Sequence, residues 1–145
     1  MGSSRVAAGT RWGTFPTTAD MGLWARSTTP DGLFSGLGMG LFAVMTDLRR
    51  VRPREVRTVR ARAPDPARLA VAYLSELVLL EDSERFVGRR VGARLNSSHT
   101  SVEAEVRGEP WDTERHPRKI DVKAVTLHGL AVSFDPPSAR VILDI

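Results

Sequence analysis

Two segments of this chain carry apolar residues at the three- and four-residue spacing of an α-helix. Each begins with a residue that favours the N-cap, followed by a proline that favours the first turn: Thr29 and Pro30, then Asp65 and Pro66. The apolar positions are Leu33, Phe34, Leu37, Leu41, Val44 and Met45 in the first segment, and Leu69, Ala70, Tyr73, Leu74, Leu77 and Leu80 in the second. The pattern predicts two helices that begin at these prolines.

The first of these helices also carries three glycines four residues apart. Gly32, Gly36 and Gly40 lie on one row of the helix surface. Each costs about 1 kcal/mol relative to alanine in a helix interior, so the row needs a reason. A phosphate-binding loop does not fit, because the glycines neither follow a strand directly nor end in Lys-Ser or Lys-Thr. We expect the row to pack closely against a sheet.

The rest of the chain alternates apolar and polar residues with the period of two that is typical of β-strands. Strands are predicted for residues 21–27, 56–63, 85–95, 100–108, 120–127, 130–134 and 139–145. Two helices early and a run of antiparallel strands late are typical of the α+β class. We therefore predict a single compact domain over residues 11–145, mostly antiparallel sheet with two helices, after a disordered N-terminal extension at residues 1–10.

Composition narrows the possible functions. The chain has 145 residues and no cysteine, which excludes disulfides, thiolate zinc sites and a cysteine nucleophile. No signal peptide is visible at the start, and no stretch approaches the roughly 20 apolar residues of a membrane span. These features predict a cytoplasmic protein with no membrane contact. The net charge of +4 permits an association with RNA without requiring one.

Seven arginines lie between Arg49 and Arg62. Part of this stretch is predicted as a strand in which Arg60 and Arg62 alternate with small apolar residues, so a solvated strand face explains it. No aromatic residue interleaves the arginines, so a base-stacking surface is not supported within the stretch. An RNA-binding module that uses this basic stretch remains the alternative function.

Familiar catalytic arrangements are missing from the sequence. None of the three histidines, His99, His116 and His128, has the spacing of a metal-ligand pair, and we expect each to be exposed or hydrogen-bonded in an ordinary way. No serine has an evident base partner. A stand-alone metal-dependent hydrolase therefore ranks last among the functions considered, because no general base is visible.

Two aspartates at the ends of predicted strands could bind a hard cation. Asp20 directly precedes the first strand predicted here, and Asp144 lies in the last, next to the terminal carboxylate of Ile145. If these strands are antiparallel neighbours, the start of one lies beside the end of the other. Carboxylate oxygens of this kind suit calcium or magnesium. The alternative is that both aspartates are simply solvated.

Several segments resemble the archease family. They are TADMG at residues 18–22, LFAVMTDL at 41–48, YLSELVLLEDSERF at 73–86, DTERHPRKIDVKAVTLHGL at 112–130 and the terminal VILDI. The match is collinear from about Trp12 to Ile145. The combination of a His-Pro pair, the Val-Lys-Ala-Val-Thr run, a further histidine and the terminal Leu-Asp-Ile is specific to the family.

The resemblance implies a fold, a partner and a metal site. Archeases are small α+β proteins that assist the RtcB-type RNA ligase, which joins RNA ends in tRNA splicing and RNA repair and uses GTP. They are not enzymes themselves: they promote guanylylation and multiple turnover of the ligase, and meet RNA only through it. The family binds a divalent metal, described with calcium, although magnesium or manganese is possible. The corresponding ligands here are Asp20, Asp144 and Ile145.

One position departs from the family pattern. Archeases usually have histidine immediately before Ala-Asp, and this chain has Thr18 there. If that histidine orients the loop, its replacement changes metal affinity or loop order. Asp47, Lys123 and His128 also match the family, and we expect them, with Thr18, to contact the ligase or to support the metal ligands. Their alternative interpretations are a helix-end acid for Asp47 and a strand face for the other two.

Overall fold

A computed structural model of the chain describes residues 9–18 and 20–145. Along these residues the elements are β1 (Arg11–Pro16), β2 (Met21–Arg26), α1 (Pro30–Met45), the short 3₁₀ helix η2 (Leu48–Arg50), β3 (Glu55–Arg62), α2 (Pro66–Glu84), β4 (Phe86–Leu95), β5 (Ser101–Pro110), β6 (Ala124–Phe134) and β7 (Pro137–Asp144).

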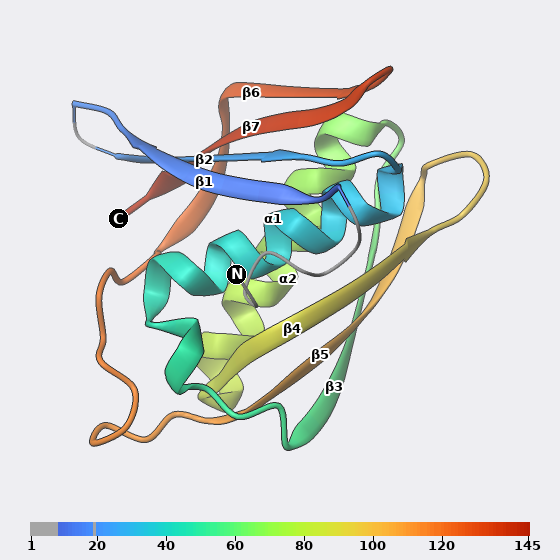
Figure 1. Cartoon of the computed structure of the whole chain (residues 1–145). Coiled ribbons are helices and arrows are strands. Elements are labelled where there is room, and N and C mark those ends of the chain that lie inside the picture. Colours follow the sequence, from blue (N-terminus) through green and yellow to red (C-terminus); the bar gives the residue numbers. More distant parts are fainter. Residues whose placement is uncertain (1–8, 19) are drawn as a thin grey trace.

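The elements form three layers, with both helices enclosed between two antiparallel sheets (Figure 1). The four-stranded sheet has the order β1-β2-β7-β6, and the three-stranded sheet has the order β3-β5-β4. Helix α1 packs between β2 and β4, whereas α2 packs between β6 and β3. The predicted α+β class with two helices is therefore confirmed, and its strands divide into two sheets.

Both helices begin where the sequence predicts. The Thr29 side chain accepts a hydrogen bond from the Gly32 amide at 2.9 Å, and Asp65 accepts one from the Arg68 amide at 2.8 Å. These bonds satisfy amides that have no partner within the helix. The predicted apolar positions of both helices are buried. Since α1 has a sheet on each side, even residues between its predicted apolar positions, such as Met39, are buried.

The glycine row of α1 packs against the four-stranded sheet, as predicted. A Cβ atom on Gly36 would lie 2.9 Å from Cγ2 of Thr10, and one on Gly40 would lie 2.6 Å from Cδ1 of Leu23. Contacts this short leave no room for a side chain. The row therefore lets α1 approach β2 closely.

The strand predictions need two corrections. The strand β1 is not predicted from the sequence, because Gly13 and the terminal Pro16 obscure its alternation. Residues 120–123 are not a strand, and the two strands predicted for 120–127 and 130–134 are one strand, β6. The register of β6 against β7 shifts between Thr126 and Ala131. Gly129, which separates the two predicted strands, therefore lies at an irregularity within a single strand.

The predicted N-terminal extension is only partly covered. Residues 1–8 lie outside the described part of the chain, whereas Thr10 is buried and its hydroxyl is 2.8 Å from that of Ser27. Among the described residues, no helix has the combination of length and apolar character that a membrane span requires.

Candidate functional site

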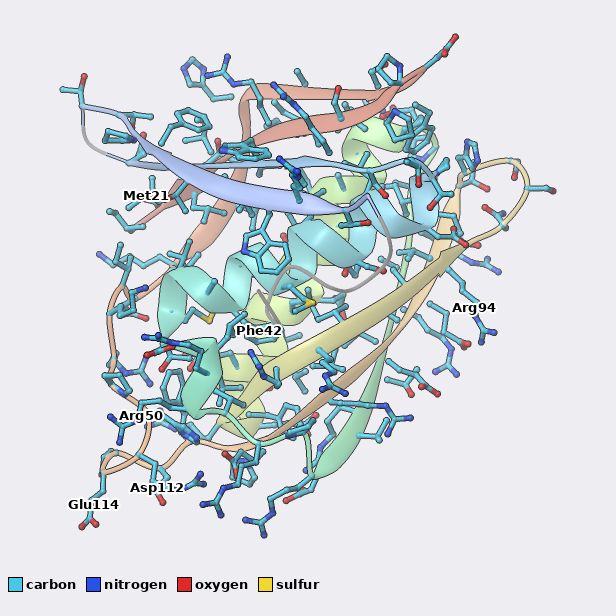
Figure 2. The ribbon with its side chains drawn as sticks, viewed as in Figure 1. Met21, Phe42, Arg50, Arg94, Asp112 and Glu114 are labelled. Carbon is cyan, nitrogen blue, oxygen red and sulfur yellow. The ribbon has the colours of Figure 1, made fainter. Side chains whose placement is uncertain are left out.

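The strands that carry the two predicted metal ligands are neighbours. β2 pairs with β7 in antiparallel register, and the last matched pair is Met21 with Leu143. Asp20 directly precedes Met21 and Asp144 directly follows Leu143, so both aspartates flank the same end of the β2–β7 ladder. Figure 1 shows the C-terminal end of the chain at the same side of the molecule as the β1–β2 connection, and Figure 2 labels Met21 there.

Asp144 presents an accessible carboxylate at this end. It is exposed, and its register partner on the other side is Ala124, whose small side chain does not cover it. The backbone carbonyl of Asp144 accepts a hydrogen bond from the Lys123 amide at 2.8 Å, which fixes the end of β7. The next residue, Ile145, is 38% exposed. An accessible carboxylate on a fixed strand end suits an oxygen-ligated cation.

The loop before Asp20 is held by a threonine. The Asp20 amide donates to Oγ1 of Thr17 at 3.0 Å, and the Asp20 side chain is partly exposed. Thr18, which stands where archeases usually have histidine, is exposed. Ala19 of the Thr-Ala-Asp motif lies outside the described residues. Thr17 therefore makes the hydrogen bond that positions the Asp20 backbone.

The predicted ligand set is not part of a larger cluster of metal-binding side chains in the described residues. Within residues 9–18 and 20–145, no three histidine, aspartate or glutamate side chains are grouped as a metal site would need. The predicted set has only two such side chains, Asp20 and Asp144, and its third member is a main-chain carboxylate. All three donors are oxygens, which fits calcium, magnesium or manganese and does not fit a soft metal.

Asp47 lies at the end of α1 and caps the short helix η2. Its carboxylate accepts hydrogen bonds from the Arg49 amide at 3.1 Å and from the Arg49 guanidinium at 3.0 and 3.1 Å. The hydrogen bonds from Arg49 lower the pKa of the Asp47 carboxyl below its usual value. Asp47 is thus a charged helix-end acid with a partner, and its side chain is still 28% exposed.

Lys123 and His128 occupy different places on β6 and the segment before it. Lys123 lines a hollow of about 480 Å³ between α2 and residues 121–125, together with Asp82 and Asp121. His128 is exposed within the irregular part of β6. Lys123 is next to the end of β7 through its backbone bond to Asp144, whereas no contact links His128 to that end in the described structure.

A buried ionic cluster that the sequence did not predict holds the segment leading to Lys123. Glu109, whose side chain is 2% exposed, accepts two hydrogen bonds from the Arg115 guanidinium at 2.8 and 3.0 Å. It also accepts one from Nε2 of His116 at 2.8 Å and one from the Arg52 amide at 2.8 Å. No sequence signal points to this cluster: Glu109 follows the strand predicted at 100–108 and stands at an outward position of β5, where exposure is expected.

Several arginines of the Arg49–Arg62 stretch form ion pairs with carboxylates. Arg49 pairs with Asp47, Arg57 pairs with Glu55 and Glu84, and Arg60 pairs with Glu103. As predicted, Arg60 and Arg62 lie on the solvated face of β3. These ion pairs reduce the net positive charge available to an anion along the stretch. The ion pairs therefore count against the alternative hypothesis, an RNA-binding module that uses the Arg49–Arg62 stretch.

Known proteins resemble this chain along most of its length. The archease protein family matches residues 12–145. Protein archease of Thermococcus gammatolerans is 36% identical over 128 residues, which is 87% of this chain and 90% of the relative. Protein archease of Thermococcus kodakarensis is 32% identical over the same shares. The solution structure of Methanobacterium thermoautotrophicum protein 1598 superimposes with a TM-score of 0.74 at 29% identity, covering 94% of this chain and 99% of that one. The chain belongs to the archease family.

Proposed function

We propose that this protein activates an RtcB-type RNA ligase, promoting its guanylylation and multiple turnover through a divalent cation held at the β2–β7 end. Membership of the archease family supports an accessory role for the chain. The observation that carries the finer proposal is the register of β2 with β7, in which the Met21–Leu143 pair brings Asp20 and Asp144 to one end.

The residues at this end divide into two roles in the proposal. Asp20, Asp144 and the carboxylate of Ile145 would hold the cation, calcium first and magnesium or manganese as alternatives. The cation would supply positive charge that offsets the negative charge of nucleotide phosphates during transfer of the guanylyl group. Lys123, whose amide bonds the Asp144 carbonyl, and Asp47, after the end of α1, would contact the ligase. His128 is the weakest candidate, because it lies in the irregular part of β6.

Thr18 adds a testable detail to this role. Threonine keeps a hydroxyl at the family's histidine position but cannot titrate between pH 5 and 8 as imidazole does. Since Thr17 already bonds the Asp20 amide, the loop does not depend on a histidine for that contact. We expect the variant Thr18→His to bind the cation at least as tightly as the parent.

Calcium and magnesium titration by calorimetry tests the site directly. Asp144→Ala should abolish binding and ligase guanylylation while leaving the thermal unfolding temperature unchanged, because its exposed side chain has no packing role. Glu114→Ala is the matched control: this exposed carboxylate is labelled well away from Met21 in Figure 2. The same titration on a chain extended beyond Ile145 tests the terminal carboxylate, which an added peptide bond would neutralise.

Two outcomes count against the proposal. Normal guanylylation with Asp144→Ala would remove the metal-bearing end from the activating role. Normal cation affinity in the extended chain would remove the Ile145 carboxylate from the ligand set and leave the two aspartates.

A further inference from the structure

The outer face of the four-stranded sheet carries two aromatic rings on open backbone. Phe15 of β1 and Trp24 of β2 occupy outward positions, since the alternate residues Trp12 and Leu23 face α1. In the described chain, no helix or strand lies over this face (Figure 1). Both rings are only partly buried.

Glycine lies beneath each ring. A Cβ atom on Gly13 would lie 2.7 Å from three atoms of the Trp24 indole, so the indole lies with its face on the backbone of β1. The ring of Phe15 lies over Gly22 of β2 in the same way. A ring that rests flat on glycine turns its other face outward. The glycine backbone covers the inner face of each ring, so a partner can reach only the outer face.

Guanidinium groups lie over these rings, on the side away from the glycines. Arg26 lies 5.5 Å from the centre of the Trp24 ring, and Arg140 lies 4.7 Å from the centre of the Phe15 ring. Neither arginine forms an ion pair with a carboxylate among the described residues. Arg26 also faces Arg11 directly across the β1–β2 ladder. Like charges in that position repel each other, and an anion bound between them would relieve the repulsion.

The same face is hollowed between its strands. A shallow hollow of about 450 Å³ is lined by Phe15, Trp24, Arg26 and Arg140, and on its far side by Ser133 and Ser138. Along the outward positions of the four described strands, acidic side chains are confined to the end at Asp144. The hollow thus combines stacking surfaces, positive charge and hydroxyl groups without a negative charge among them.

We propose that this face binds single-stranded RNA, with bases stacked on Trp24 and Phe15 and phosphates contacted by Arg26, Arg140 and Arg11. Aromatic rings on an open antiparallel sheet bind unpaired bases, and flanking cations follow the backbone. The hydroxyls of Ser133 and Ser138 can bond a ribose 2′-hydroxyl, which favours RNA over DNA. This goes beyond the proposed function, because it gives the chain a direct contact with RNA that needs no ligase.

The outer face of the three-stranded sheet is the natural comparison. It also carries arginines, but Glu103 pairs with Arg60 at 2.8 Å and with Arg94 at 3.7 Å, and Glu105 pairs with Arg107 at 3.5 Å. No aromatic residue occupies an outward position of these strands within the described chain. Arg94 is labelled on this face in Figure 2. The outer face of the three-stranded sheet therefore offers positive charge without stacking rings, and its arginines supply the matched control variants.

The experiment measures fluorescence anisotropy of a labelled oligouridylate of about 12 nucleotides, titrated with the full chain alone. Trp24→Leu keeps apolar cover over Gly13 but removes the indole face, and should weaken binding about tenfold. Arg26→Gln with Arg140→Gln should reduce the slope of log affinity against log salt by about 1.4, at about 0.7 for each phosphate contact. Arg60→Gln with Arg94→Gln removes the same charge elsewhere and should leave both quantities unchanged. Thermal unfolding of each variant checks the fold.

Four results of the anisotropy titration would overturn the assignment. These are no binding by the parent at low salt, equal losses in the Arg60 and Arg94 control, equal affinity for a duplex, and equal affinity for DNA of the same sequence. In a separate binding experiment with the ligase, loss of ligase binding by Trp24→Leu, while the parent chain shows no RNA affinity, would likewise overturn the assignment. That result would make the face a protein contact. Since the anisotropy titration contains no ligase and no calcium, its result is independent of the cation site at Asp144.

Discussion

Glu109 is an acid buried within a group of positive and neutral donors. Burial by itself raises the pKa of its carboxyl, but hydrogen bonds from Arg115, the Arg52 amide and His116 outweigh burial and lower the pKa to about 2. His116 accepts a hydrogen bond from the Asp112 amide at Nδ1, so Nε2 carries the proton that bonds Glu109. This cluster fixes the turn after β5 through charge and hydrogen bonding together.

The lowered pKa predicts how stability depends on pH. In the unfolded chain a glutamate titrates near 4.3, so the folded state binds this proton more weakly and gains stability above that pH. The contribution, up to about 3 kcal/mol, is lost as pH falls from about 5 toward 2. Urea unfolding measured at a series of pH values should show this loss in the parent.

Glu109→Gln should remove that part of the pH dependence. At pH 7 it should also lower the free energy of unfolding by about 3 kcal/mol, because Arg115 loses its buried partner. Glu105→Gln changes an exposed glutamate of the same strand and should cost less than about 0.5 kcal/mol. An unchanged slope between pH 5 and 3 in Glu109→Gln would show that another group is responsible.

At the scale of elements, β4 and β5 approach each other through paired glycines. Gly88 and Gly108 are register partners, and a Cβ atom on Gly108 would collide with the carbonyl oxygen of Val87 and lie 2.8 Å from Cα of Gly88. Above Gly88, the ring of Phe42 would lie 2.7 Å from an added Cβ. The glycines therefore set the distance between two strands and let α1 rest on β4.

Two alanine substitutions on this strand pair should have opposite effects. Gly108→Ala should lower the free energy of unfolding by about 3 kcal/mol, because backbone atoms must move to make room. Gly92→Ala, at a position where an added Cβ meets nothing within 4 Å, should raise it by about 0.5 kcal/mol through reduced backbone freedom in the unfolded state. Denaturant titration of both variants measures this. Equal stability of the two variants would contradict the packing argument.

At the scale of the whole molecule, both sheets share one pair of helices. Tyr73 of α2 donates a hydrogen bond to the Phe34 carbonyl of α1 at 2.8 Å, and their rings lie 5.3 Å apart. Each helix buries residues against both sheets, so loss of one sheet would expose the helix faces that cover the other. The two sheets should therefore unfold together.

Tryptophans on opposite sheets can report on this cooperativity. Trp24 belongs to the four-stranded sheet, whereas Trp111 follows β5 and donates to Glu81 at 2.9 Å. Variants that keep only one of them, by replacement of the others with phenylalanine, should give coincident urea midpoints, matching that of circular dichroism. Separate midpoints for the two reporters would show that the sheets unfold independently.

The sequence by itself determined the local elements. Both helices begin at their predicted caps, because an N-cap side chain and a following proline act within a few residues of the helix start. Most strands follow their alternation, since the pleat imposes a period of two whatever the partner strand. The same local information failed where the pattern was interrupted, in β1 and in the irregular part of β6.

The tertiary structure decided which strands pair and which side chains from distant segments come together. Strand ends at Asp20 and Asp144 are predicted from the sequence, but only the β2–β7 register shows that these ends lie side by side. The aromatic and basic face draws Phe15, Trp24 and Arg140 from three strands, and its first and last members are 125 positions apart in the numbering. Burial of Glu109 likewise depends on Arg115 and Arg52, which reach it from loops. Pairing and burial arise from contacts between distant segments, and periodicity within one segment carries no information about them.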